Sequence, residues 1–158
     1  MSAYRKLRFE SLEQCVAEVR RIVAASEAGR LVSSGQWTPG QILAHVAAWI
    51  EYGYRGYPIK PPPFFIRWVL RLRLRSMLER GLPRGVKIPG VPGVPGGTIG
   101  ADEVTTVAAA ERLLAALRRL EQRQEATFDS PAFGPMSHED RVRLNLRHAE
   151  LHLGHLSY

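Results

Sequence analysis

The stretch WTPGQILAHVAAWIEY, residues 37–52, carries the strongest helix-start signal in the chain. Thr38 can cap a helix because its hydroxyl can accept a hydrogen bond from the amide three residues on, and Gln41 can return a bond to the cap. Pro39 suits the first helical position, where its missing amide hydrogen is not needed. These signals predict a helix that begins at Pro39 and ends at about Arg55.

Three more long segments are predicted to be helical. SLEQ, residues 11–14, is a capping-box pattern followed by apolar residues at helical spacing. Similar cap signals and apolar faces recur in the second half of the chain. The three helices are expected from about Leu12 to about Leu31, from Asp102 to near Ala126, and from a cap at Ser137 to the C-terminus. With no convincing strand, the sequence predicts an all-α fold, most simply an antiparallel four-helix bundle in a single domain over residues 1–158.

The segment 56–100, between the second and third of these helices, has a different composition. It contains PPP at 61–63 and the tract GLPRGVKIPGVPGVPGGTIG at 81–100, whose VPG triplets forbid a regular helix or a central strand. Between these breakers, FFIRWVLRLRLRSMLER at 64–80 allows a short helix, although LRLRLR alone also alternates like a strand. We therefore expect a long, Pro/Gly-rich insertion that contains one short helix.

The net charge of +7 belongs entirely to this insertion. Residues 60–87 contain eight basic residues and one acidic residue, and the rest of the chain is balanced. A helix at 64–80 with aromatic, leucine and arginine residues could bind a membrane surface, and clustered arginines also bind nucleic acid phosphates. We favour a third interpretation, in which the apolar side of this helix packs on the bundle and its arginines are solvated. Neither a membrane nor a nucleic acid is then the expected partner.

Other features of the sequence favour a cytoplasmic protein. The first residues lack the apolar region of a secretory signal, and no apolar run reaches the roughly 18 residues needed to span a bilayer. Cys15, the single cysteine, cannot form an internal disulfide, and it falls among apolar residues at helical spacing. It is expected to be a small buried core residue in a reducing compartment rather than a nucleophile.

Three of the five histidines, His148, His152 and His155, lie close together in NLRHAELHLGHLSY at 145–158. On a helix that advances about 100° per residue, all three share one face. The charged residues of the same segment mark the opposite side, which predicts that His148 and His152 point to the core and that His155 is displaced toward a flank. These charged residues are Glu139, Asp140, Arg143, Arg147 and Glu150.

Burial of two imidazoles costs free energy unless each ring nitrogen has a partner, and one metal ion can serve both rings. Two core histidines satisfied by backbone carbonyls or water explain the same spacing equally well. A third ligand would come from another helix, and His45 is the better candidate because His138 lies about 15 Å along the helix axis from His148. His45, His148 and His152 would then form a three-nitrogen site with open positions, as in catalytic metal sites.

The stretch WTPGQILAHVAAWIEY, together with PAFGPMSHEDRVRLNLRHAELHL near the C-terminus, resembles the DinB/YfiT-like superfamily, and especially one of its uncharacterised bacterial branches. The resemblance covers most of the chain. It implies a four-helix bundle, often dimeric, that holds a divalent metal, zinc or nickel among others, through His45, His148 and His152. It also implies that His155 is an accompanying polar residue and not a ligand.

The resemblance implies less about the reaction. Relatives in the superfamily include transferases and isomerases that use a low-molecular-weight thiol, and proteins described as metal-dependent hydrolases. In a hydrolase the metal would lower the pKa of a bound water, and in a thiol transferase it would deprotonate a cofactor thiol. The insertion at 56–100 departs from the simpler members, so the substrate stays open.

Three residues near the histidines are weaker candidates for a catalytic role: Arg141, Asn145 and His155. Arg141 and Asn145 face the same side of the predicted last helix as His148, where they could orient an anionic substrate. Arg141 is more readily explained as an ion-paired or exposed residue at the start of the helix. Asn145 could equally hold a metal ligand in place or contact a neighbouring helix.

Two interpretations without catalysis stay open beside the metal-dependent enzyme. One is a metal-free bundle that acts in assembly, as a homodimer. The other is a membrane-surface or nucleic-acid binder that uses the basic residues 60–87.

Overall fold

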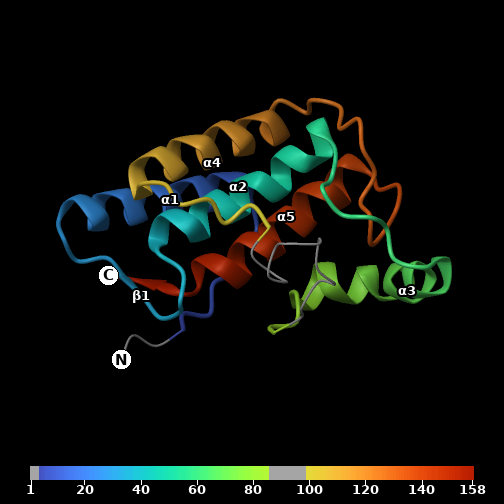
Figure 1. Ribbon diagram of the computed structural model, residues 1–158, viewed down its shortest axis with the longest axis horizontal. Coiled ribbons are helices and arrows are strands. Elements are labelled where there is room, and N and C mark those ends of the chain that lie inside the picture. The colour runs from blue at the N-terminus through green and yellow to red at the C-terminus, as the bar shows by residue number, and fades with distance from the viewer. Residues whose placement is uncertain (1–3, 86–98) are drawn as a thin grey trace.

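The computed structural model describes residues 4–85 and 99–158, and over these residues the protein is helical with five helices and two very short strands (Figure 1). In chain order the elements are α1 (Leu12–Glu27), β1 (Val32–Ser33), α2 (Pro39–Arg55), α3 (Phe64–Arg80), α4 (Thr106–Glu121), α5 (His138–Leu153) and β2 (Leu156–Ser157). The predicted all-α class is confirmed. The expectation that the chain has no strand was wrong in detail, because β1 and β2 pair antiparallel, with Val32 opposite Ser157.

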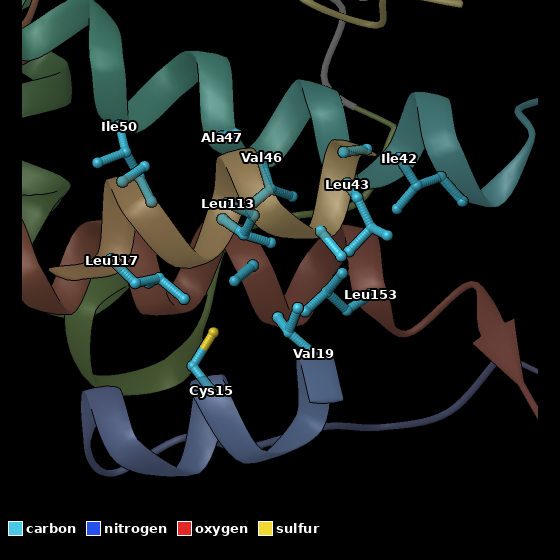
Figure 2. Close-up of a cluster of buried hydrophobic side chains, with 14 of the residues drawn as sticks. Cys15, Val19, Ile42, Leu43, Val46, Ala47, Ile50, Leu113, Leu117 and Leu153 are labelled. Carbon is cyan, nitrogen blue, oxygen red and sulfur yellow. The ribbon is translucent and has the colours of Figure 1, made fainter. Parts of the chain in front are cut away.

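The hydrophobic core is built from α1, α2, α4 and α5 (Figure 2). Its largest fully buried side chains include Val19 from α1, Leu43 from α2, Leu113 and Leu117 from α4, and Leu153 from α5. Full burial of one such side chain contributes roughly 1.5–3 kcal/mol. Among the described residues α3 adds none to this cluster, so the core places α2 against α5 and leaves α3 at the side (Figure 1).

The predicted start of α2 is confirmed. The Gln41 amide lies 3.2 Å from the Thr38 hydroxyl, and the Thr38 amide lies 2.9 Å from the Gln41 side-chain oxygen, which completes the capping box. Gly40 is required in the same first turn, because a Cβ atom there would lie 2.0 Å from the carbonyl oxygen of Val104. The chain ahead of α4 therefore runs in close contact with the first turn of α2.

The predicted ends of two helices were wrong. α4 begins at Thr106 and not at Asp102, because Thr105 caps it by accepting a bond from the Ala108 amide at 3.2 Å, while the Asp102 carboxylate pairs with Arg112 at 2.8 Å. It also ends earlier than Ala126, at Glu121. α1 ends at Glu27 rather than near Leu31, since Gly29 adopts a left-handed φ of 66° just beyond it.

The predicted solvent face of α5 was also partly wrong. Arg147 and Glu150 are buried, because the N-terminal segment crosses this face. The Arg147 guanidinium donates to the Phe9 carbonyl at 2.6 Å, and the Glu150 carboxylate accepts from the Phe9 amide at 2.6 Å. The two side chains lie 3.1 Å apart and hold one residue of the N-terminal segment by both of its backbone groups.

The short helix predicted at 64–80 is present as α3, which contacts α5 (Figure 1). Its two buried side chains are Leu74 and Leu78. Arg71 fixes it to the connector before α5, since its guanidinium donates to the carbonyls of Phe133 and Pro135 at 2.6 and 2.8 Å. The VPG triplets predicted to be loop lie outside the described residues. Among the described helices, none is both long enough and apolar enough to cross a membrane.

Candidate metal site

Three histidines from two helices converge at the interface of α2 and α5. His45 lies in the middle of α2, and His148 and His152 are one turn apart on α5. One ring nitrogen from each lies within 4.8 Å of the others. The ring centroids are 5.0 Å apart for His45 and His148, 4.4 Å for His45 and His152, and 4.6 Å for His148 and His152. This three-histidine group could hold a metal ion.

A backbone carbonyl fixes the tautomer of His45. Its Nδ1 atom lies 2.7 Å from the carbonyl oxygen of Ile99. Because a carbonyl can only accept, Nδ1 must carry the proton, and the lone pair of a neutral ring is then on Nε2. Histidines that bind metals in proteins almost always donate from their second nitrogen to a carboxylate, a backbone carbonyl or water. His45 is therefore oriented and protonated as a ligand would be.

Two tryptophans flank the three histidines. The Trp37 ring stacks on His152 with centroids 5.8 Å apart and planes 13° apart, and it also contacts His45 at 4.9 Å. Trp49, one turn after His45, meets the edge of His148 at 5.7 Å. These rings cover part of the imidazoles with apolar surface.

All three imidazoles have a lowered pKa, chiefly because burial disfavours the charged ring. The pKa of His45 falls to about 4 and that of His152 to about 3, and the pKa of His148 is also well below its usual value. The repulsion that charged neighbouring rings would exert lowers the pKa of His148 and His152 further. At neutral pH the site therefore presents uncharged rings, the form that coordinates metals.

The donor set fits a divalent transition metal. The Nδ1 atom of His148 is buried and has no hydrogen-bond partner among the described residues. An unsatisfied buried polar atom costs roughly 1–3 kcal/mol, and a metal bound by the ring is one way to offset that cost. Imidazole nitrogen suits zinc, copper, iron and nickel, and three protein ligands are one fewer than a closed tetrahedral site requires.

His148 and His152 lie in the three-histidine group as predicted, but the face of α5 expected to be exposed to solvent is partly buried. Because Arg147 and Glu150 are buried, the positions of the charged residues on α5 do not identify its solvent-exposed side. The most deeply buried apolar residues of α5, Leu146, Ala149 and Leu153, lie roughly 100–160° around the helix from His148. His148 and His152 are thus partly exposed and lie at the edge of the core, where α5 meets α2.

Among the described residues, the contacts of Arg141 and Asn145 are with groups other than the three histidines. Arg141 is buried, contrary to the favoured expectation, and it makes no ion pair with any described residue. Its guanidinium lies against Gly53 near the end of α2, since a Cβ atom on Gly53 would be 2.9 Å from it. Burial raises the pKa of Tyr57, and the positive charge of Arg141 lowers it in part. Asn145 donates to the Arg141 carbonyl at 2.9 Å, a bond within the same helix.

His155 is separate from the three-histidine group, as predicted, but α5 ends before it. The helix stops at Leu153, so the angle assigned to His155 on a continuous helix does not apply. Its Nδ1 lies 3.0 Å from the Ser34 hydroxyl, and its ring meets that of Tyr4 at 5.0 Å. The structure therefore assigns it to the contact between the two chain segments around β1 and β2.

Ile99 and Gly100 were not predicted to lie at this site, because both fall in the Pro/Gly-rich insertion. Gly100 has a left-handed φ of 80°, and a Cβ atom there would lie 2.5 Å from the Ala48 Cβ. A glycine is needed for the chain to reach α2 this closely and bring the Ile99 carbonyl to His45. The available signal was a glycine at the end of the tract, which alone does not say what it approaches.

Comparison with known proteins gave one match. No curated protein and no solved structure is significantly similar to this chain. The DinB/YfiT-like resemblance therefore stays a prediction. A family model described as "Protein of unknown function (DUF1569)" matches residues 1–158. Since this match covers every residue from the first helix to the last histidine, the chain belongs to the DUF1569 family.

Proposed function

We propose that this protein is a metal-dependent enzyme of the DinB/YfiT-like type, with His45, His148 and His152 as the metal ligands. The observation that supports the proposal is the convergence of three uncharged imidazole nitrogens, from two helices, within 4.8 Å of one another. A four-helix bundle formed by α1, α2, α4 and α5, with α3 in the insertion, is part of the same proposal.

Two reaction classes are proposed. One is hydrolysis, and the other is a transfer reaction that uses a low-molecular-weight thiol. A divalent ion held by three imidazoles and open to a further ligand supplies Lewis acidity, which activates water or a thiol near neutral pH. The chain's own residues prepare this chemistry. The Ile99 carbonyl fixes the proton on Nδ1 of His45, and Trp37 and Trp49 pack against the histidine rings.

The native metal is proposed to be zinc or nickel, since neutral imidazole suits both. A homodimer in the cytoplasm is the proposed state of the protein, on the strength of the family resemblance and of the single buried thiol Cys15. Arg141, Asn145 and His155 stay weak candidates for a catalytic role, because their hydrogen bonds are with groups outside the three histidines: Asn145 donates to the Arg141 carbonyl, and His155 pairs with Ser34.

Metal content tests the site. Protein purified without chelators and without a metal affinity column is expected to contain about one divalent ion per chain, and elemental analysis measures it. His148→Ala is expected to lose the ion, whereas His155→Ala is expected to keep it, since that ring lies outside the group. Absence of metal from the native protein, with no rise in melting temperature on adding zinc or nickel, would contradict the proposal.

Activity is tested separately. The metal-loaded protein is assayed with a panel of low-molecular-weight thiols and electrophilic acceptors, and with ester, amide and phosphoester substrates. Turnover that depends on a thiol supports the transferase, and turnover in its absence supports the hydrolase. Bound metal without turnover of either kind would leave the metal site standing and count against the enzyme.

A further inference from the structure

The first half of α3 exposes a group of large apolar side chains. Phe64 is 84% exposed, Trp68 64% and Leu72 64%, and Phe65 and Val69 are also exposed. This overturns the expectation that the apolar side of this helix packs on the bundle. The buried side chains of α3 are Leu74 and Leu78, which lie on its other side, and the helix contacts α5.

These exposed side chains form one continuous surface. At about 100° per residue, Phe65, Trp68, Val69 and Leu72 fall within roughly 100° of one another, and they point away from the direction of Leu74 and Leu78. Exposed hydrophobic residues scattered singly need no explanation, whereas a contiguous group indicates a contact surface. We call Phe64, Phe65, Trp68, Val69 and Leu72 the α3 apolar surface.

Arginines border this surface on both sides. Arg75 lies roughly 20° from Trp68 around the helix, and Arg73 and Arg80 lie beyond Val69 on the other side. All three are exposed, and none makes an ion pair with any described residue. Arg71 is different, because it donates to the carbonyls of Phe133 and Pro135 and so anchors α3 to the rest of the protein. The surface is therefore apolar at its centre, and near its rim three exposed arginines outnumber one exposed acidic residue, Glu79, on the same side of the helix.

We propose that the α3 apolar surface binds the surface of an anionic lipid membrane, with α3 lying in the membrane plane. Aromatic and leucine side chains would enter the boundary between headgroups and acyl chains, and the arginines would meet the anionic headgroups. This activity is independent of the metal site, since α3 contains none of the three histidines.

Charge decides between this partner and the two other candidates. A second copy of the chain, paired α3 to α3, would bring Arg73, Arg75 and Arg80 of both copies together, and like charges at a contact are unfavourable. The remainder of the chain has equal numbers of basic and acidic residues, so it offers no acidic excess to receive them. Nucleic acid would neutralise the arginines but would leave Phe65, Trp68 and Leu72 without an apolar partner.

Co-sedimentation with vesicles tests the proposal on the full chain. The protein is expected to bind vesicles of phosphatidylcholine with phosphatidylserine and to bind phosphatidylcholine vesicles far less. Each arginine near an anionic surface contributes about fivefold to binding, so Arg73→Gln with Arg75→Gln should weaken it about 30-fold. Trp68→Ser with Leu72→Ser should also weaken it by at least about tenfold. Higher salt should reproduce the loss caused by the arginine variant and not the loss caused by the apolar variant.

Matched controls separate this surface from general charge and hydrophobicity. Arg20→Gln with Arg118→Gln removes the same charge from exposed positions on α1 and α4, and Val107→Ser removes an exposed apolar side chain from α4. Both controls should bind as the unmodified protein does. A further variant, Trp68→Phe, should still bind but lose the blue shift of tryptophan fluorescence that vesicles induce.

Three outcomes would overturn the proposal. The first is no binding to the anionic vesicles at physiological salt. The second is binding that the α3 variants and the controls change equally. The third is light scattering that shows a dimer in the native protein and a monomer in Trp68→Ser with Leu72→Ser, which would assign the surface to a second copy.

Discussion

The Nδ1 atom of His45 donates to the carbonyl oxygen of Ile99 across 2.7 Å, and this bond joins the middle of α2 to a residue 54 positions later in the chain. It is the contact by which the end of the 56–100 insertion reaches the three histidines. If the histidines bind metal, this bond does for His45 what second partners do for metal-binding histidines in general, since it sets the ring orientation and raises the basicity of Nε2.

Gly100→Ala is expected to weaken metal binding without removing a ligand. The new Cβ would lie 2.5 Å from the Ala48 Cβ, at a backbone φ of 80°, so the chain must move away from α2 and carry the Ile99 carbonyl with it. Loss of such a partner typically costs 10–100-fold in metal affinity. Titration calorimetry with zinc measures the change.

Gly85→Ala is the matched control. Its backbone φ of 75° is nearly the same, so the conformational cost of the alanine is similar, but no atom lies within 4 Å of the added Cβ. Its zinc affinity should match that of the unmodified protein. Equal affinity in both variants would show that the Ile99 carbonyl does not support the site.

The metal-free protein is expected to lose stability as pH falls below about 6.5. Burial lowers the pKa of His45 to about 4 and of His152 to about 3, while in the unfolded chain both are near 6.5. Between these values the unfolded chain binds more protons, so the free energy of unfolding rises with pH. The contribution is fully present above pH 6.5 and is lost as pH falls toward 4, by about 3 kcal/mol for His45 alone.

Urea unfolding of metal-free protein at a series of pH values measures this dependence. Glu150 acts in the opposite direction, because burial raises the pKa of its carboxyl and the folded state then holds the proton more tightly. His152→Gln should reduce the slope between pH 4 and 6.5, since one of the displaced titrations is removed. A slope unchanged by this variant would contradict the assigned cause.

Local signals in the sequence were sufficient for α2 and α3. Thr38, Pro39 and Gln41 fix the start of α2 through contacts within one turn, and the bounds of α3 follow from the proline and glycine that flank it. Asp102 failed as a helix start because its carboxylate is used by Arg112, ten residues away, while Thr105 provides the cap. When two nearby residues could each cap a helix, the sequence does not show which of them is already occupied by a tertiary contact.

The site was predictable to the level of its three histidines but not beyond them. Four-residue spacing on α5 and a lone histidine on an apolar helix are visible in sequence. Burial of Arg147 and Glu150 is not, because it depends on where the N-terminal segment crosses α5. For the same reason no sequence pattern connects Ile99 with His45. Apolar spacing also failed on α3, since it shows that Trp68 and Leu72 share a face but not whether that face is covered.

Cys15 is expected to be unreactive in the folded protein. Its side chain is fully buried, as the sequence predicted, and burial raises the pKa of the thiol to about 12. At pH 8 only about one thiol in 10,000 would then be ionised, and reagents reach it only when the protein opens. Labelling with a disulfide reagent should therefore follow the rate or free energy of unfolding, with rapid reaction in denaturant. Rapid labelling under native conditions would contradict the packing of α1.

Arg147→Ala is expected to cost about 3–5 kcal/mol in the free energy of unfolding, because it leaves the buried Glu150 carboxylate without its charged neighbour and the Phe9 carbonyl without its donor. Burial already lowers the pKa of Arg147 and raises that of Glu150, so each charge is held at a cost that its partner offsets. Arg143→Ala, an exposed arginine on the same helix, should change stability by no more than about 0.5 kcal/mol. Urea unfolding of the two variants at pH 7.5 makes the comparison. Similar losses in both would show that the N-terminal segment does not depend on this pair.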